Sequence, residues 1–162
     1  MSSFLPQKPL DEGKLDAALA LMDAGRFSAA FRVLCELQAD DHAGALFARG
    51  VCLFRAGEYF EAAVYFEKSL TALKKIRPLG RLTTKPDIYR ILRKQEIAQK
   101  VYLKPFRLGM VSDDLSLIIS EDIMMAAADA YIHCGNTDKA KTLISALNGS
   151  EFDEIKSLIY SK

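Results

Sequence analysis

The chain has 162 residues with no tryptophan, only five prolines and only two histidines. Few prolines leave long segments free to form helices, because proline interrupts the helical hydrogen-bond pattern. The histidines, His42 and His133, have no third ligand at the spacing of a metal site, and we expect neither a metal nor a cofactor. The GxGxxG, GxxxxGK[ST] and GxSxG motifs are also absent, so no pattern here is typical of an enzyme.

Cysteines and long apolar runs are also scarce. The three cysteines, Cys35, Cys52 and Cys134, are odd in number and show no CxxC spacing, so we interpret them as small buried hydrophobic residues in a reducing compartment. No apolar run approaches the roughly 20 residues needed to cross a bilayer, and the amino terminus lacks the apolar core of a signal peptide. We therefore expect a soluble, intracellular protein without membrane contact.

One sequence pattern occurs twice, 32 residues apart. Residues 24–30 are AGRFSAA and residues 56–63 are AGEYFEAA, so glycine, an aromatic residue and alanine recur at matching offsets. A period in the low thirties with these residues is typical of stacked two-helix repeats, in which each unit buries its apolar face against its neighbours. Glycine fits the turn between the helices because it adopts the left-handed conformation without strain.

The spacing of apolar residues predicts a single all-α domain over residues 1–162. Breaker residues at 76–85 interrupt the pattern, and a helix is expected from Pro86 to about Leu103. Ser150 and Asp153 form a candidate capping box for the last helix. The expected units are helix pairs at about 10–38, 43–75 and 113–147, a basic helical insertion at 76–112, and a terminal helix at 151–160.

Charge is distributed unevenly along the chain. Residues 74–107 contain eleven Lys or Arg and only two acidic residues, so this segment carries +9 and the rest of the chain, which totals +1, carries −8. Such an arrangement attracts acidic partners or brings two surfaces of the same chain together. The basic patch that we single out consists of Lys74, Lys75, Arg77, Arg81, Arg90, Arg93 and Lys94.

The basic segment also contains aromatic residues, Tyr89, Tyr102 and Phe106, a combination compatible with nucleic-acid binding. The same segment has an apolar stripe, however, which includes Ile88, Ile91, Leu92, Ala98 and Val101. We therefore expect the stripe to pack on the protein and the charges to form a solvated face. Binding to nucleic acid or to a membrane surface is not expected.

The repeated segments resemble the tetratricopeptide repeat family. The departures are Thr137, where the family has an aromatic residue, and Ser69, where it has a small apolar one. The resemblance implies a helical-hairpin solenoid that binds other proteins and carries no reaction. The matching positions are Ala18, Gly50 and Ala128 in the first helices; Gly25, Gly57 and Gly135 in the turns; Ala30, Ala62 and Ala140 in the second helices; and Leu34, Phe66 and Ile144 after them.

In a helix-pair solenoid the first helix of each pair lines the concave side. The tetratricopeptide modules that clamp a carboxylate tail resemble one another in Lys, Arg and Asn at these places, and this chain lacks that set. An amphipathic helix or an extended apolar segment suits the lining better. The alternative is that the central helix or the amino-terminal segment of the same chain covers it. The expected partner or dimer groove is lined by Leu15, Leu19, Met22, Phe47, Val51, Phe54, Met125 and Ile132.

The order of the repeat units and the basic insertion along the chain makes the resemblance more specific. The strings at 53–59 and at 138–140, together with the basic run that reaches Arg77-Pro78, are similar to the amino-terminal domain of the tetratricopeptide subunits of the anaphase-promoting complex, above all the subunit-seven group. This resemblance implies a non-catalytic scaffold of a multi-subunit ubiquitin ligase, with a role in the cell cycle and mitosis in the nucleus or cytoplasm. It also implies a homodimer that contacts other subunits, and a longer repeat array of which this chain is a part.

A second function stays open. Small tetratricopeptide chaperones of bacterial type III secretion hold an apolar segment of a client protein in their groove. Those chaperones have consecutive repeats, whereas here the basic insertion separates the second unit from the third. The scaffold is therefore the favoured interpretation.

Overall fold

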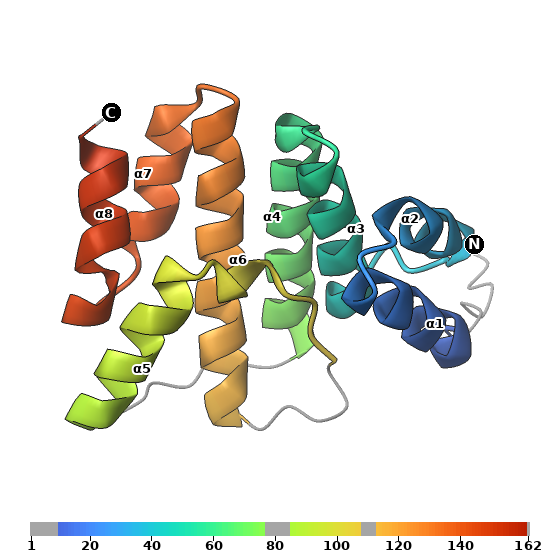
Figure 1. Cartoon of the computed structure of the whole chain (residues 1–162), viewed down its shortest axis with the longest axis horizontal. Coiled ribbons are helices and arrows are strands. Elements are labelled where there is room, and N and C mark those ends of the chain that lie inside the picture. Colours follow the sequence, from blue (N-terminus) through green and yellow to red (C-terminus); the bar gives the residue numbers. More distant parts are fainter. Residues whose placement is uncertain (1–9, 77–84, 108–112, 162) are drawn as a thin grey trace, which may run out of the picture.

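The computed structural model describes residues 10–76, 85–107 and 113–161, and these residues form helices and turns without a strand. They confirm the predicted all-α class. No helix within these ranges is long and apolar enough to cross a bilayer. The elements are α1 (Glu12–Asp23), α2 (Phe27–Glu36), α3 (Ala43–Arg55), α4 (Tyr59–Ile76), α5 (Asp87–Ala98), the 3₁₀ turn η1 (Val101–Leu103), α6 (Asp113–His133), α7 (Thr137–Ser145), the 3₁₀ turn η3 (Ser150–Phe152) and α8 (Asp153–Tyr160) (Figure 1).

Three helical hairpins, α1–α2, α3–α4 and α6–α7, are closed by the same turn. Gly25, Gly57 and Gly135 have φ of 75°, 83° and 82°, which is the left-handed region that favours glycine. In each turn the glycine N–H donates to the carbonyl three residues earlier at 2.9–3.1 Å, and the next N–H donates to the carbonyl five residues earlier at 2.8–2.9 Å. This is the Schellman pattern, which satisfies the last carbonyls of the first helix.

Within the second hairpin, α3 and α4 approach each other closely. A Cβ atom on Gly50 would lie 2.6 Å from Cε1 of Phe66 and 3.3 Å from the carbonyl oxygen of Ala62. Phe66 and Ala62 are fully buried, so the ring has no free space into which it can move. The small residues of the sequence pattern are therefore required here by the distance between the helices.

In Figure 1 α3, α4, α6, α7 and α8 stand upright side by side in a row, and the α1–α2 hairpin lies beyond α3, tilted against this row. The basic insertion separates the α3–α4 hairpin from the α6–α7 hairpin in sequence, but α4 packs directly against α6. In Figure 1 the described part of the insertion, residues 85–107, lies across one face of the row, where η1 contacts α6 and α5 contacts η3. This part therefore packs on the row and does not separate α4 from α6.

Three local predictions are wrong. The central helix ends at Ala98, before Leu103, because Lys100 has the left-handed conformation (φ 55°, ψ 37°) and reverses the chain. Ser150 lies in a 3₁₀ turn, and α8 begins at Asp153 without a side-chain cap, so the capping box does not form. Two of the three cysteines are exposed, and Cys52 alone is buried, since the other two lie on outer faces of their helices.

Candidate functional site

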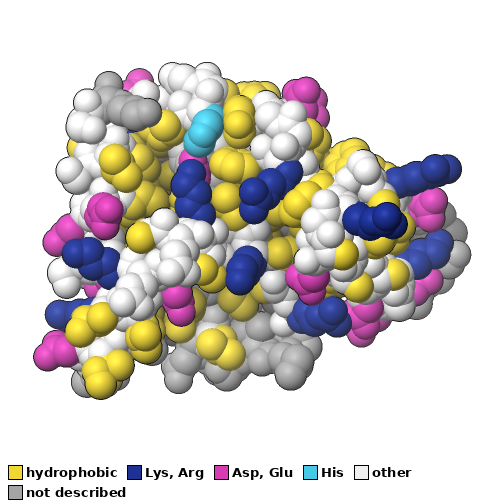
Figure 2. Space-filling model, viewed as in Figure 1, with side chains coloured by type: hydrophobic (Ala, Val, Ile, Leu, Met, Phe, Trp, Pro, Cys, Tyr) yellow, Lys and Arg dark blue, Asp and Glu magenta, His cyan; other side chains and the backbone are white. Residues whose placement is uncertain are grey.

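The apolar face of helix α5 points toward solvent, and its opposite face is buried. Ile88, Ile91 and Leu92 were expected to pack on the protein, but their exposed fractions are 70%, 58% and 53%. The opposite face buries Arg93, which is only 3% exposed, beside Ile97. Figure 2 shows hydrophobic side chains gathered over α5 at the lower left of the molecule. We call Ile88, Ile91 and Leu92 the α5 stripe.

A buried ionic contact explains this orientation. One guanidinium nitrogen of Arg93 lies 2.8 Å from Oδ1 of Asp122 and 3.5 Å from Oε2 of Glu96, and the other lies 3.6 Å from Oε1 of Glu121. The second nitrogen also donates to the Ile118 carbonyl at 3.4 Å. Because a buried charge needs opposite charges around it, the acidic residues of α6 determine which face of α5 turns inward.

A second cation joins the same cluster. The ammonium group of Lys85 pairs with the carboxylate of Glu151 and donates to the Asn148 carbonyl at 2.8 Å. We call Lys85, Arg93, Glu121, Asp122 and Glu151 the charged joint. The basic insertion and the acidic remainder of the chain therefore attract each other within one molecule, one of the two outcomes that the uneven charge predicted.

The charged joint is incompletely satisfied. It contains three carboxylates for two cations, and one oxygen of Glu151 and the nearby Tyr89 hydroxyl are buried without a hydrogen-bond partner. Burial raises the pKa of Glu121, and the attraction of Arg93 and Lys85 opposes this. Burial also raises the pKa of Asp122, again against the attraction of Arg93. The ionised joint is therefore costly to bury.

This cost predicts how stability depends on pH. A carboxyl group whose pKa is raised in the folded state stabilises the fold when protonated, and this contribution is lost as the pH rises through the raised value. We expect Glu121→Gln, which is always neutral, to be more stable than the wild type at pH 7. The gain should shrink as the pH falls toward 4.5, the ordinary pKa of the group. Urea denaturation of both proteins at a series of pH values measures the difference in their free energies of unfolding.

The control for this series is Glu154→Gln, since Glu154 is exposed on α8. It should leave the pH dependence of stability unchanged. A Glu121→Gln variant that is less stable than the wild type at pH 7 would show that the ion pair with Arg93 outweighs the burial cost.

The groove residues expected from the sequence lie mostly inside the chain. Leu15, Leu19, Met22, Phe47, Val51 and Met125 are buried in the single chain, whereas Phe54 and Ile132 are partly exposed. A partner can therefore reach only the last two without displacing part of this chain.

The segment after α5 covers Phe47. We call residues 100–107 the strap. The ring of Phe106 lies 5.2 Å from the ring of Phe47, centre to centre, and the Tyr102 hydroxyl donates to Asp129 at 2.7 Å. Lys100 approaches the same carboxylate at 3.2 Å. The strap thus lies over the first helices of the hairpins, the face where the sequence placed a groove.

An aromatic group marks the open end of this face. The ring of His133 stacks on Tyr59 at 4.5 Å, and Phe54 meets both rings edge-on at 5.1 and 5.5 Å. Nδ1 of His133 lies 3.0 Å from Oδ1 of Asp129. From the sequence, no metal site was expected at His133 and no specific partner was assigned to it. The signal that was missed is the spacing of four residues that places Asp129 and His133 on one face of α6.

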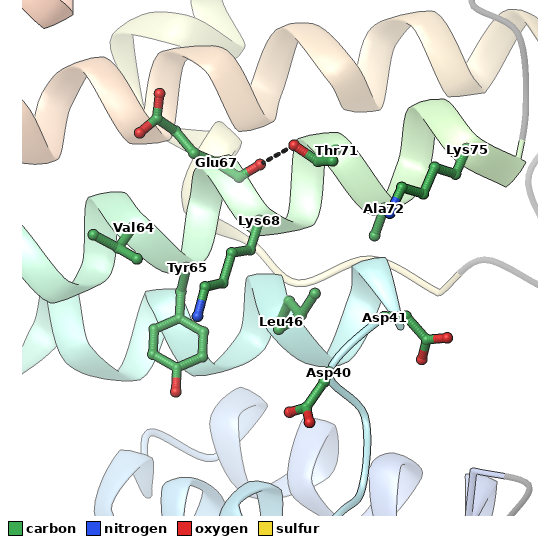
Figure 3. A pocket seen from close by; sticks show the side chains of 10 residues that line it. All are labelled: Asp40, Asp41, Leu46, Val64, Tyr65, Glu67, Lys68, Thr71, Ala72 and Lys75. Carbon is green, nitrogen blue, oxygen red and sulfur yellow. Dashed lines mark hydrogen bonds between the residues drawn. The ribbon is translucent and has the colours of Figure 1, made fainter. Parts of the chain in front are cut away.

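A separate pocket of about 510 Å³ lies between the α2–α3 turn and α4 (Figure 3). Asp40 and Asp41 stand on the side of the turn, and Lys68 and Lys75 stand on α4. Leu46 belongs to its apolar floor. With both signs of charge in the lining, the pocket favours neither a cation nor an anion.

The residues of the predicted basic patch do not share one environment. Lys74, Lys75, Arg90 and Lys94 are exposed, Arg93 is buried, and Arg77 and Arg81 lie outside the described residues. The expected solvated face is therefore wrong for Arg93, because the acidic residues of α6 hold it inside.

Within the part of the chain that the structure describes, no three His, Cys, Asp or Glu side chains are arranged to hold a metal ion. Comparisons with protein-family models, with curated proteins and with solved structures find no match. The described residues thus define an all-α chain with three glycine-closed hairpins, in which α5 presents three neighbouring apolar residues to solvent.

Proposed function

We propose that this chain is a non-catalytic protein-interaction scaffold, made of tetratricopeptide-like hairpins, that self-associates through the α5 stripe. The observation that carries the proposal is the outward orientation of Ile88, Ile91 and Leu92, each of which is more than half exposed in the single chain. The three identical glycine turns support the hairpin class. From the sequence resemblance, we propose a ubiquitin ligase of the anaphase-promoting type as the assembly.

The outer face of α5 is complementary to a second copy of itself. Ile88, Ile91, Leu92 and Gln95 are spaced i, i+3, i+4 and i+7, so they share one face of the helix. In an antiparallel pair Ile91 meets Leu92 of the second copy, and the reverse contact forms by symmetry. The apolar stripe then covers itself.

The charges beside the stripe fit the same arrangement. Asp87 and Lys94 are seven residues apart, so they lie on the same flank of α5, and both are exposed. In the antiparallel pair the Asp87 carboxylate faces Lys94 of the second copy, and two such ion pairs form. Neither residue has an ion-pair partner within the described residues.

The size of the surface determines the expected affinity. Three partly exposed aliphatic side chains bury less than the roughly 800 Å² that each partner contributes to a standard interface. We therefore expect a reversible dimer with a dissociation constant on the order of 10 μM, and not a permanent one.

Ile88→Glu combined with Ile91→Glu should abolish this dimer, because it would bury four acidic side chains in one apolar contact. Sedimentation velocity over a hundredfold range of concentration measures the association. The matched control is Phe60→Glu with Leu158→Glu, which replaces two other exposed apolar residues, 58% and 60% exposed, and should leave the dimer intact.

A charge exchange tests the antiparallel geometry. Lys94→Asp should weaken the dimer, and Asp87→Lys in the same chain should restore it. A wild-type chain that stays monomeric at every concentration, or a dimer that survives the double glutamate variant, contradicts the proposal.

The chaperone alternative receives no support from this geometry. Those chaperones hold an apolar client segment against an apolar lining, whereas here six of the eight expected lining residues are buried by the chain itself and the remaining contacts of the strap include the carboxylates of Asp129 and Asp16. We therefore retain the scaffold.

A further inference from the structure

We infer that the face formed by α1, α3 and α6 is a binding site for an extended aromatic and basic segment of a partner protein, and that the chain occupies this site with its own strap. The site is separate from the α5 stripe, and the inference does not depend on self-association. The strap shows which chemistry the site recognises.

The strap contacts the first helix of every hairpin. On α6, Asp129 accepts the hydrogen bond of the Tyr102 hydroxyl at 2.7 Å. On α3, Phe106 places its ring against that of Phe47. On α1, Asp16 pairs with Arg107. These helices are far apart in sequence, and an extended segment that runs across them contacts them as a bound peptide does.

The conformation of the strap agrees with this comparison. After η1 the chain becomes extended at Lys104 (ψ 134°) and continues without regular structure to Arg107. In Figure 1 this part crosses the row of helices from α6 toward α3. Close approach is possible because α3 has a glycine at the contact. A Cβ atom on Gly44 would lie only 3.2 Å from the carbonyl oxygen of Phe106.

The recognition groups of the site follow one another in a fixed order along the path of the strap. Asp129, which is 9% exposed, lies at one end, the ring of Phe47 lies in the middle and Asp16 lies at the other end. Carboxylates at both ends select basic residues and repel acidic ones. The preferred segment therefore has Tyr and Phe four residues apart and a cation at each end, as Lys100, Tyr102, Phe106 and Arg107 have here.

A partner segment has to compete with the strap. When a site is open for only a small fraction of the time, its apparent affinity is the intrinsic affinity multiplied by that fraction. Weakening the strap should therefore raise the affinity for the same sequence supplied as a separate peptide. Tyr102→Phe with Phe106→Ala does this conservatively, because the first change keeps the buried ring and Phe106 is only partly buried.

The test uses a fluorescent peptide of residues 100–107 with capped ends and measures its anisotropy with the full chain. We expect the strap variant to bind this peptide at least tenfold more tightly than the wild type does. A peptide with Glu in place of its Lys and Arg residues is the control and should not bind. Asp129→Asn, added to the strap variant, should weaken binding by about tenfold, as expected for a lost buried charged hydrogen bond. Asp16→Asn should weaken it by about threefold, because the Asp16–Arg107 pair is about half exposed.

Circular dichroism establishes that the variants remain folded, and Phe106→Ala alone replaces any double variant that does not. A folded strap variant that fails to bind the peptide overturns the inference, and so does binding that neither aspartate change affects. Ile88→Glu with Ile91→Glu should leave peptide binding unchanged, which separates this result from the test of the α5 dimer.

Discussion

Phe47→Ala is expected to lower the free energy of unfolding by about 3–5 kcal/mol, which is the usual cost of removing a large buried aromatic side chain. Phe47 is fully buried, and its ring lies 5.1 Å from that of Phe66 and 5.2 Å from that of Phe106. Alanine would leave a cavity between α3, α4 and the strap. Urea denaturation followed by circular dichroism measures the loss.

The matched control is Phe60→Ala, which removes the same atoms from a side chain that is 58% exposed. It should change stability by no more than about 0.5 kcal/mol. If Phe47→Ala were as mild as this control, Phe47 would belong to an open groove and not to the core of the single chain. The experiment therefore distinguishes the two roles that its position in the sequence allows.

Arg93→Met should weaken the docking of α5 by about 3–5 kcal/mol, because it leaves buried carboxylates without their cation. Asp122 lies 2.8 Å from the guanidinium group and Glu121 lies 3.6 Å from it. α5 should leave the surface before the hairpins unfold. Hydrogen exchange of the α5 amides should accelerate by about a hundredfold or more, whereas amides of α3 should change little.

Two further variants test whether the loss of charge causes the weaker docking of α5. Arg90→Met changes an exposed arginine of the same helix and should leave exchange in α5 unchanged. Arg93→Met combined with Asp122→Asn and Glu121→Gln removes both sides of the contact and should recover much of the loss, since neutral partners need no cation. A full-sized loss in the triple variant would show that Arg93 stabilises α5 through packing and not through charge.

The turns and the close helix contacts were predictable from sequence because local chemistry determines them. Gly25, Gly57 and Gly135 have a backbone conformation that glycine adopts most readily. The spacing of 32 residues located the first two reversals, and the match of the residues around Gly135 to the earlier units located the third. Ala62 was expected to allow close approach because of its small size, and Gly50 was singled out by the resemblance to the tetratricopeptide pattern. The short distance between α3 and α4 requires small residues at both positions. The helices of the three hairpins accordingly begin and end close to the expected residues.

The orientation of α5 was not predictable in this way. Its apolar residues recur at helical spacing, and by itself that pattern predicts that Ile88, Ile91 and Leu92 face inward. The pattern does not contain the position of Asp122, which comes from another helix and holds Arg93 at 2.8 Å. The choice between two faces of one helix therefore depended on a contact across the fold.

The sequence by itself determined an all-α chain, three glycine-closed hairpins and an apolar lining on their first helices, because each follows from backbone conformation or from the spacing of neighbouring residues. Only the tertiary structure decided what lies against that lining and which side of α5 faces solvent. Both depend on pairs distant in the sequence, such as Arg107 with Asp16 and Tyr102 with Asp129. Local periodicity carries no information about such pairs, since the free energy of a buried charge or ring depends on what the rest of the fold places beside it.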